Sequence, residues 1–267
     1  MTAIEKLEIL KNNLSKLKNL TVAFSGGVDS TFLLTVAKDV LNENVLAVTV
    51  NAFVHTNKEI KESIEYANKI DVKHTVLNIK DINIQEFIDN VPQRCYFCKK
   101  EIFTQIIKIS NKNKIINIAD GSNIDDLSDF RPGMKALKEL GIMSPLKEAG
   151  LTKQEIRDLS KMLDIPTWNK PSFACLASRI PYNHKITQQK LQMVEKSEEF
   201  ISQLGFKQFR VRHHGEIARI ELPQSDILKF IESDSSNKAC KYLKSLGFNY
   251  VTIDLLGYRT GSMNEVL

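Results

Sequence analysis

Residues 21–30 of the chain read Thr21-Val22-Ala23-Phe24-Ser25-Gly26-Gly27-Val28-Asp29-Ser30. The apolar run at the start predicts a buried strand, and the segment from Thr31 to Ala37 predicts a helix. Gly26 and Gly27 between them allow a tight turn in which the backbone can approach a ligand without a Cβ in the way. Because the first N–H groups of a helix are free and its dipole favours negative charge, this arrangement predicts a phosphate-binding turn.

Ser25 and Ser30 add hydroxyl donors to this turn, and Asp29 adds a carboxylate. No Gly-Lys-Ser or Gly-Lys-Thr follows, so the turn is not a Walker A loop. Ser-Gly-Gly-Val-Asp-Ser instead resembles the PP-loop of ATP pyrophosphatases. This resemblance implies that the loop holds the β- and γ-phosphates of ATP while a substrate oxygen attacks the α-phosphorus, which forms an adenylate. The alternative is a glycine-rich turn without a ligand.

The composition is that of an ordinary soluble globular protein. The chain has 267 residues, of which 26% are charged and 42% hydrophobic, and this length fits one large domain or one and a half. No apolar run is long enough to span a membrane, and the N-terminus lacks the apolar stretch of a signal peptide, so we expect a cytoplasmic protein without a membrane partner. The net charge of +5 is compatible with binding of polyanionic small molecules or of RNA. Because the lysines are scattered and form no block, the charge by itself indicates no particular ligand.

Strand and helix patterns alternate through the first part of the chain. Further strands are predicted at residues 45–50, 74–79 and 115–119, and helices at residues 3–17, around 60–67, and at 99–109. Alternation of this kind predicts an α/β fold with a doubly wound parallel sheet, in which ligands bind at the carboxyl ends of the strands. We therefore expect the loop at residues 25–30, Asn51 and residues 119–123 to meet at one crevice.

A second polar cluster runs from Asp120 to Asp126. Carboxylates beside a triphosphate can hold Mg²⁺, which prefers oxygen ligands. The Gly-Ser-Asn-x-Asp-Asp pattern also resembles the matching stretch of PP-loop enzymes, which implies that Gly121, Asn123 and Asp125 bind ATP. The alternative is a solvated, turn-forming loop. Further on, residues 152–155 form a capping box that predicts a helix through Leu163, to which we assign no chemistry.

The pattern changes after about residue 180, where we place a domain boundary. Residues 1–180 are predicted to form the first domain, and residues 181–267 a smaller α+β domain for substrate binding or oligomerisation. A unit of helix, Leu-Gly-Phe and strand occurs twice, with its central tripeptide at residues 204–206 and 246–248. Each glycine stands where a helix C-cap needs a left-handed residue.

Three cysteines can be assigned to one metal centre. Cys95 and Cys98 form a C-x-x-C motif, and Cys175 stands far downstream. Three thiolates leave one position open, which suits a [4Fe–4S] cluster with one reactive iron, whereas structural zinc needs four closed ligands. His213 and His214 could complete a zinc site, and this alternative stays open.

Two other interpretations of the cysteines remain. A redox dithiol of the thioredoxin kind would need Cys95 and Cys98 to open a helix after a βαβ strand. Cys240 keeps helical spacing with Leu243 and Gly247 on an apolar face, so we predict that it belongs to the core.

Six segments together resemble one family, the ATP-dependent sulfur transferases of nickel-pincer nucleotide biosynthesis (the LarE family). The segments lie at residues 25–30, 121–126, 129–134, 175–182, 210–212 and 257–264. The resemblance implies an adenine nucleotide alpha hydrolase-like fold and a pyridinium-3,5-biscarboxylic acid mononucleotide as substrate. ATP would adenylate one ring carboxylate with loss of pyrophosphate, and sulfur would then displace AMP to leave a thiocarboxylate.

The family has two branches that differ in the origin of the sulfur. In one, a cysteine at the position of Cys175 gives up its own sulfur and becomes dehydroalanine. In the other, three cysteines hold a [4Fe–4S] cluster whose free iron carries a hydrosulfide. Because Cys95, Cys98 and Cys175 are all present, the resemblance places this chain in the cluster branch.

The resemblance also implies roles for other residues. Cys175, Asp29 and Glu198 are expected to be catalytic. The arginines expected to bind the substrate and its phosphate are Arg131, Arg179, Arg210, Arg212 and Arg259. Period-two alternation sets Arg210 and Arg212 on one face of a strand. The alternatives are surface salt bridges or a subunit interface for the arginines, and a solvated helix position for Glu198.

The expected partners are the small nucleotide substrate and a sulfide donor, and the family implies a homo-oligomer. A tRNA-thiolating PP-loop enzyme is the alternative function, but the lysines form no basic stripe with interleaved aromatic residues, so we expect no nucleic acid. A nucleotide-sensing module without catalysis is a further alternative, against which the intact Asp29, Asp125 and Asp126 argue.

Overall fold

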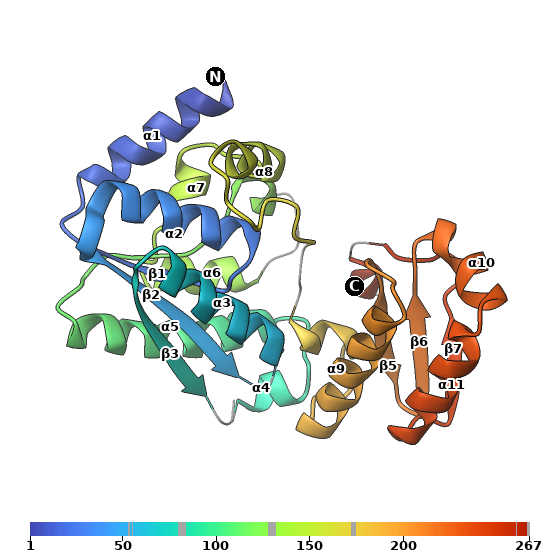
Figure 1. Cartoon of the computed structure of the whole chain (residues 1–267). Helices are drawn as coiled ribbons and strands as arrows, with labels where there is room; N and C mark the ends of the chain where they lie inside the picture. Colours follow the sequence, from blue (N-terminus) through green and yellow to red (C-terminus); the bar gives the residue numbers. More distant parts are fainter. Residues whose placement is uncertain are drawn as a thin grey trace. The chain divides into compact units, whose positions relative to one another are not determined.

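The computed structural model describes residues 1–52, 54, 56–79, 84–127, 132–171, 175–259 and 261–265. The chain forms two compact units, each described here by itself (Figure 1). Unit 1 contains residues 1–84 and 93–173, and unit 2 contains residues 85–92 and 174–267. The predicted phosphate ligand Arg131 lies outside the described residues.

Unit 1 is built on a parallel four-stranded sheet, which confirms the predicted α/β class. Its strands are β1 (Leu20–Ala23), β2 (Val45–Ala52), β3 (Lys73–Ile79) and β4 (Ile118–Ala119), in the order β3-β2-β1-β4. Strand β4 is shorter than the predicted 115–119. The reason is that Ile115 still belongs to the turn that ends the preceding helix, where its N–H donates to the Ser110 carbonyl at 3.0 Å.

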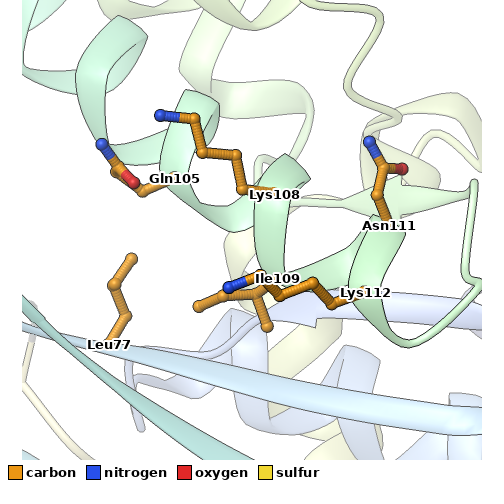
Figure 2. Close-up of a pocket in the computed structure, with 6 residues that line it drawn as sticks. All are labelled: Leu77, Gln105, Lys108, Ile109, Asn111 and Lys112. Carbon is orange, nitrogen blue, oxygen red and sulfur yellow. The ribbon is translucent and has the colours of Figure 1, made fainter.

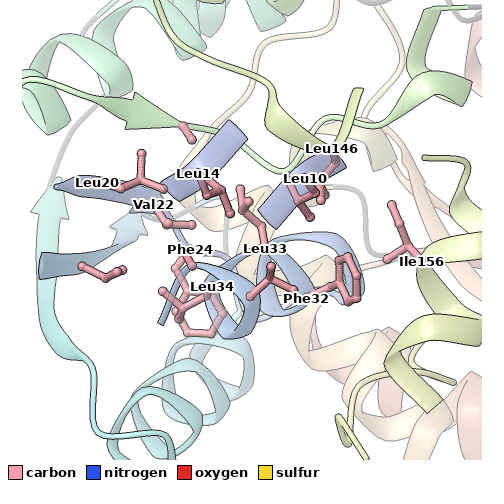
Figure 3. Close-up of a cluster of buried hydrophobic side chains, with 14 of the residues drawn as sticks. Leu10, Leu14, Leu20, Val22, Phe24, Phe32, Leu33, Leu34, Leu146 and Ile156 are labelled. Carbon is pink, nitrogen blue, oxygen red and sulfur yellow. The ribbon is translucent and has the colours of Figure 1, made fainter. Parts of the chain in front are cut away.

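Helices cover both faces of this sheet. They are α1 (Ala3–Ser15), α2 (Val28–Leu41), α3 (Asn57–Lys69), α5 (Arg94–Lys112), α6 (Gly133–Glu139), α7 (Pro145–Glu148) and α8 (Lys153–Met162). Strand β2 alternates: Val45 and Ala47 pack into a core with α1, α2 and α8, whereas Leu46 and Val48 pack against α5. Figure 3 shows part of the first core, including Leu10 of α1, Phe32 of α2 and Ile156 of α8. This period-two alternation buries both faces, as a doubly wound sheet requires.

Three of these helices begin with a threonine capping box, in which the Thr side chain and a Glu three residues later each bond the other's backbone N–H. The capping residues are Thr2 for α1, Thr56 for α3 and Thr152 for α8. The box at Thr152 confirms the prediction for this helix, because it satisfies N–H groups that have no partner inside the helix.

Unit 2 contains a second, three-stranded sheet. Strands β5 (Arg210–His214) and β6 (Ile217–Glu221) form an antiparallel hairpin, and β7 (Tyr250–Ile253) pairs in parallel with β6. The helices of this unit are α4 (Gln85–Ile88), α9 (Gln188–Gln203), α10 (Gln224–Glu232) and α11 (Ser235–Ser245). His213 and His214 are the last two residues of β5, and the turn of the hairpin follows at Gly215, which has φ 63°.

The two Leu-Gly-Phe tripeptides end α9 and α11 as predicted. Gly205 and Gly247 have φ values of 93° and 114°, the left-handed conformation that glycine adopts without strain. Phe206 and Phe248 then enter the same buried core. Cys240 is only half-buried, because the buried face of α11 runs through Ala239 and Leu243.

Residues 85–92 are fastened to unit 2 by backbone and side-chain hydrogen bonds. The Ile186 N–H donates to the Ile88 carbonyl at 2.8 Å, and the Asn183 N–H donates to the Asn90 carbonyl at 3.0 Å. The buried Asn90 side chain donates to the Pro181 carbonyl at 2.7 Å. In the described part of the chain, no helix has both the length and the apolar character that crossing a membrane requires.

Candidate functional site

The glycine turn between β1 and α2 has the geometry of an anion site. Gly26 has φ 69°, and Gly27 is the N-cap of α2, which receives no side-chain capping hydrogen bond. The helices α1, α3, α8 and α9 all start with a Thr side chain that does cap. The first turn of α2 thus keeps its N–H groups and its dipole available for a bound anion.

The two predicted serines meet in this turn. The Oγ atoms of Ser25 and Ser30 lie 3.0 Å apart, and the Ser25 N–H lies 3.3 Å from the Ser30 Oγ. Ser30 is buried. Their mutual hydrogen bond fixes the shape of the loop.

Gly121 brings the second polar cluster against the start of α2. A Cβ on Gly121 would lie 3.0 Å from the Ser30 nitrogen and 3.2 Å from its Cα, so a larger residue here would push against the backbone at the start of α2. The neighbouring Asn123 donates from its Nδ2 to the Asp29 carboxylate at 3.3 Å. The structure therefore brings Gly121, Asn123 and Asp29 together, as the sequence predicts.

Asp125 and Asp126 have different surroundings. Asp126 is buried and accepts the Asn123 N–H at 3.0 Å, which shapes the loop from inside. Asp125 is exposed and accepts the Lys153 N–H at 2.7 Å, at the first residue of α8. Its carboxylate thus links the polar cluster to the start of α8.

Two lysines for which the sequence predicts no role in the site reach this loop. Lys153 forms an ion pair with Asp29 through its Nζ. Lys170 donates from its Nζ to the Gly26 carbonyl at 2.9 Å and to Glu62 at 2.6 Å. Lys153 lies in the capping box at residues 152–155, but this motif predicts only the start of a helix and not a contact with the glycine turn. Lys170 lies in no recognisable motif.

Cys95 and Cys98 lie within the first five residues of α5, which begins earlier than the predicted residue 99. Both are half-buried, and a spacing of three residues puts them on one side of the helix. A Cβ on Gly133 would lie 3.3 Å from the Cys95 carbonyl oxygen, so α6 begins close to the start of α5. Two neighbouring thiols at a helix N-terminus are a donor pair suited to iron or zinc, and the position also meets one requirement of a redox dithiol.

Cys175 belongs to unit 2 and directly precedes a 3₁₀ turn at Leu176–Arg179. All four cysteines lie in the described part of the chain, and none forms a disulfide. Among the described residues, no three His, Cys, Asp or Glu side chains are grouped as metal ligands. His213 and His214 point to opposite faces of β5, since neighbouring residues of a strand alternate, and His213 packs on the Phe248 ring.

Arg179 and Glu198 form a buried pair next to Cys175. The guanidinium of Arg179, 1% exposed, donates from Nε and Nη2 to the two carboxylate oxygens of Glu198 at 3.0 and 3.1 Å. Its Nη1 donates to the Cys175 carbonyl at 3.1 Å. The Glu198 carboxylate also accepts the Val211 N–H at 3.1 Å. The pair thus holds the turn that carries Cys175 against α9 and β5.

The arginines of β5 lie on the polar face of its sheet. Arg212 is buried and pairs with the fully buried Glu221 at 2.7 Å, while its Nη1 donates to the Ser178 carbonyl at 3.1 Å. Its Nε is buried and has no hydrogen-bond partner in the part of the chain that the structure describes. Burial, followed by the charge of Arg179, lowers the pKa of Arg210.

Arg259 differs from these arginines in its exposure and partners. It pairs with Glu265 at 3.0 Å through its Nε, on the surface of unit 2. This hydrogen bond raises the pKa of Arg259. Arg259 thus forms a surface salt bridge, which is the alternative to its predicted role as a phosphate ligand.

A separate cleft of about 620 Å³ opens in unit 1 between β3 and α5 (Figure 2). It is lined by Leu77, Gln105, Lys108, Ile109, Asn111 and Lys112. These residues include none of the predicted site residues, so the cleft is distinct from the glycine turn.

Known proteins resemble the chain along its whole length. A family profile described as a PP-loop domain matches residues 1–130. The pyridinium-3,5-bisthiocarboxylic acid mononucleotide synthase of Lactiplantibacillus plantarum is 37% identical over 270 residues, covering 100% of this chain and 96% of the relative.

Two uncharacterised relatives are similar over comparable lengths. One from Synechocystis is 38% identical and covers 98% of both chains. One from Methanocaldococcus jannaschii is 34% identical over 97% of this chain and 100% of its own length. With a PP-loop site in the structure and a named synthase matched from end to end, the chain belongs to the LarE family of PP-loop, ATP-dependent sulfur transferases.

Proposed function

We propose that this enzyme adenylates a carboxylate of pyridinium-3,5-biscarboxylic acid mononucleotide with ATP and converts it into a thiocarboxylate. The observation that carries the proposal is the uncapped start of α2 at Gly27, closed on its other side by Gly121. The full-length similarity to a synthase named for the bisthiocarboxylic acid product supports the choice of substrate.

The proposed reaction has two balanced steps. A carboxylate oxygen of the substrate attacks the α-phosphorus of ATP, the bond to the β-phosphate oxygen breaks, and pyrophosphate leaves. The carbonyl carbon of the acyl adenylate then accepts hydrosulfide, its bond to the AMP oxygen breaks, and AMP leaves. The thioacid loses its proton to give the thiocarboxylate.

The residues of unit 1 bind and orient ATP in this scheme. Backbone N–H groups at the start of α2 and the hydroxyls of Ser25 and Ser30 hold the phosphates. Asp29, which accepts a hydrogen bond from Asn123, would contribute an oxygen ligand to the Mg²⁺ of ATP. Preorganised donors of this kind stabilise the charge that develops on the leaving pyrophosphate.

The arginines of unit 2 bind the substrate's phosphate in this scheme. The buried Nε of Arg212 has no acceptor among the described residues, which supports this role. Each charge-assisted hydrogen bond to a phosphate contributes about 1.5–3 kcal/mol. Arg179 and Arg210 add positive charge in this scheme, and the charge of Arg179 lowers the pKa of Arg210, after the larger effect of burial. Arg259 would have to leave Glu265 to take part.

Cys95, Cys98 and Cys175 would hold a [4Fe–4S] cluster, and the paired thiols at the start of α5 fit this soft-metal centre in donor type and spacing. When bound, the cluster would supply the sulfide that replaces AMP. An external sulfide donor and a homo-oligomeric assembly complete the proposal.

The decisive experiment is a single incubation of anaerobically reconstituted protein with ATP, the dicarboxylate mononucleotide and sulfide. AMP, pyrophosphate and a thiocarboxylate are expected in equal amounts. Release of ADP instead of AMP contradicts attack at the α-phosphorus. Mass spectrometry of the protein after turnover separates the branches, because sulfur loss at Cys175 marks the sacrificial one.

A further inference from the structure

The cleft between β3 and α5 lies at the edge of the parallel sheet of unit 1. In the part of the chain that the structure describes, β3 pairs only with β2, so its outer edge offers the backbone N–H and C=O groups of every second residue. An edge of this kind can accept a further strand. We propose that the cleft is a docking site for an extended, acidic peptide segment of a partner protein, which adds a strand beside β3.

Strand β3 has few of the features that keep an exposed edge from pairing. Charged side chains and proline normally protect such edges. Of the seven residues Lys73–Ile79, only Lys73 is a lysine, arginine or carboxylate, and none is proline. None of the seven is buried. From His74 onward the edge is therefore open to an extended chain.

The walls of the cleft match the length of a short peptide. At one end, Lys73 donates from its Nζ to the Asn113 Oδ1 at 2.8 Å, at the C-cap of α5. From this contact β3 rises about 13 Å to Leu77, and α5 runs about 12 Å back to Gln105, at about 3.3 and 1.5 Å per residue. The two walls are thus of similar length, and a stretch of about four extended residues fits along them.

The floor of the cleft is apolar. Leu77 and Ile109 are half-buried and pack against the core beneath α5. Figure 2 shows the Leu77 side chain directed from β3 toward α5. Because side chains of an extended peptide alternate between two sides, an apolar residue at every second position can cover Leu77 and Ile109.

The rim of the cleft is positively charged. Lys108 and Lys112 lie one turn apart on the exposed side of α5, and neither forms an ion pair with a described residue. Glu101 is the single acidic residue of α5, and it already accepts the Gln105 Nε2 at 2.8 Å. Carboxylates between the apolar residues of a peptide would therefore complement this rim.

The same charge would suit single-stranded RNA, but the lining favours a peptide. Bases of single-stranded RNA stack on aromatic side chains, and no aromatic residue is among the described residues that line the cleft. The docking site is independent of the proposed reaction, because its lining includes none of the predicted site residues.

The test is fluorescence anisotropy of the full-length protein with an arrayed set of short labelled peptides. In these peptides valine, leucine or isoleucine alternates with glutamate or aspartate, and members of the set should bind. The double variant Lys108→Glu/Lys112→Glu should bind them at least about tenfold more weakly, because two attractive charge pairs become repulsive. Lys138→Glu, at an exposed lysine of α6, is the matched control and should bind as the native protein does.

A second measurement separates the backbone contacts from the charges. In an added strand, only every second N–H of the peptide faces β3. Of two peptide versions N-methylated at alternate residues, one should lose affinity and the other should keep it. Bound peptide should also slow the hydrogen exchange of β3 and leave that of β1 unchanged.

Three results overturn the proposal. They are an array without any binding peptide, native affinity in Lys108→Glu/Lys112→Glu, and equal affinity of both N-methylated versions without slower exchange in β3. Mixed-sequence single-stranded RNA is the competing probe. If RNA binds the native protein and not the double variant, while the peptides do not bind, the cleft is a nucleic-acid site instead. Thermal unfolding of the double variant confirms that its fold is native.

Discussion

The carboxylate of Glu198 has three donors around it, two from Arg179 and one from the Val211 backbone. Its predicted catalytic role stays a prediction, but this geometry gives it a positioning role toward Cys175. Removing it leaves the buried Arg179 guanidinium without its counter-charge. We expect Glu198→Ala to lower the free energy of unfolding by about 3 kcal/mol, measured by urea denaturation.

The exposed neighbour Glu199 is the matched control, because it lies on the same turn of α9. Glu199→Ala should change stability by less than about 0.5 kcal/mol. If Glu198→Gln keeps native stability and Cys175 reactivity but loses all turnover, the positioning role is wrong and the carboxylate acts in the chemistry.

His214 makes the stability of unit 2 depend on pH. Burial, followed by the charge of Arg219, lowers the pKa of His214 to about 4, whereas the unfolded chain has the ordinary value near 6.5. The unfolded state therefore binds a proton more readily between these values, so stability rises with pH through the window and is lost as pH falls toward 4. The loss should be of the order of 2 kcal/mol.

Urea denaturation at pH 7 and pH 5 measures this effect. His214→Gln should flatten the difference between the two pH values, whereas substitution of the exposed His184 should leave it. If His214→Gln leaves the pH dependence of stability unchanged, other groups cause it. Candidates are His74 and His213, whose pKa values are also lowered by burial.

At the residue scale, the sequence predicted the loop residues because their motif is local. Ser25, Ser30 and Asp29 lie within six positions, and their meeting follows from one turn. Lys153 and Lys170 reach the same loop from positions more than 120 residues away, and no spacing rule connects them to it.

At the scale of elements, the start of α2 depends on the glycine facing it. In Gly121→Ala, the new Cβ meets the Ser30 nitrogen and Cα, which are helix backbone atoms and cannot turn aside. We expect ATP affinity to fall at least about tenfold and stability to fall by about 1–3 kcal/mol. Calorimetric titration and thermal unfolding measure the two effects.

Gly141→Ala provides the comparison. A Cβ there meets nothing within 4 Å, but the φ of 67° strains alanine by about 1–2 kcal/mol. It should therefore lower stability and leave ATP binding alone. If Gly121→Ala binds ATP with native affinity, the close contact of Gly121 with the start of α2 is not needed for the ATP site.

The start of α5 places the thiols of Cys95 and Cys98 on one side of the helix. We expect anaerobically purified protein to be brown, and Cys95→Ala to lose the visible absorbance, because two remaining thiolates hold a [4Fe–4S] cluster poorly. Cys240→Ala, on α11 of unit 2, should keep the colour. Colourless native protein containing one zinc ion per chain would contradict the cluster.

The elements followed from periodicity where side chains alternate cleanly. The capping box at Thr152 and the glycine C-caps of α9 and α11 were predictable because each satisfies a backbone group locally. The length of β4 was not predictable, because the apolar residues Ile115 and Ile116, which follow α5, have the sequence pattern of a strand although β4 begins only at Ile118. The start of α5 was missed for a similar reason: nothing in residues 93–98 caps a helix through a side chain.

At the scale of the whole molecule, Asn90 joins residues 85–92 to the rest of unit 2. It is fully buried, has φ 59°, and its side chain donates to the Ile180 and Pro181 carbonyls. Asn90→Ala removes these hydrogen bonds and strains the backbone. We expect a loss of about 2–4 kcal/mol, seen as faster hydrogen exchange in β5–β7 and unchanged exchange in β1–β3.

Asn183 also has a positive φ, 64°, but is exposed. Asn183→Ala should therefore show the backbone strain alone, about 1 kcal/mol. Equal effects of the two substitutions would mean that the buried hydrogen bonds of Asn90 contribute nothing.

The division of the chain could be read only in part from the sequence. A change of pattern near residue 180 was visible, because a parallel sheet and a mixed one have different spacing of strands. Nothing in residues 85–92 marks them as belonging to unit 2, since their partners at Asn183 and Ile186 lie almost 100 residues away.

The membership of residues 85–92 in unit 2 has a consequence for biosynthesis. Residues 85–92 leave the ribosome about 90 residues before their partners in unit 2, which at 5–20 residues per second is a wait of roughly 4–18 s. While the rest of unit 1 is synthesised, residues 85–92 still lack Asn183 and Ile186, the residues they bond to. The speed of translation between residues 92 and 186 therefore sets how long residues 85–92 are accessible to proteases and chaperones.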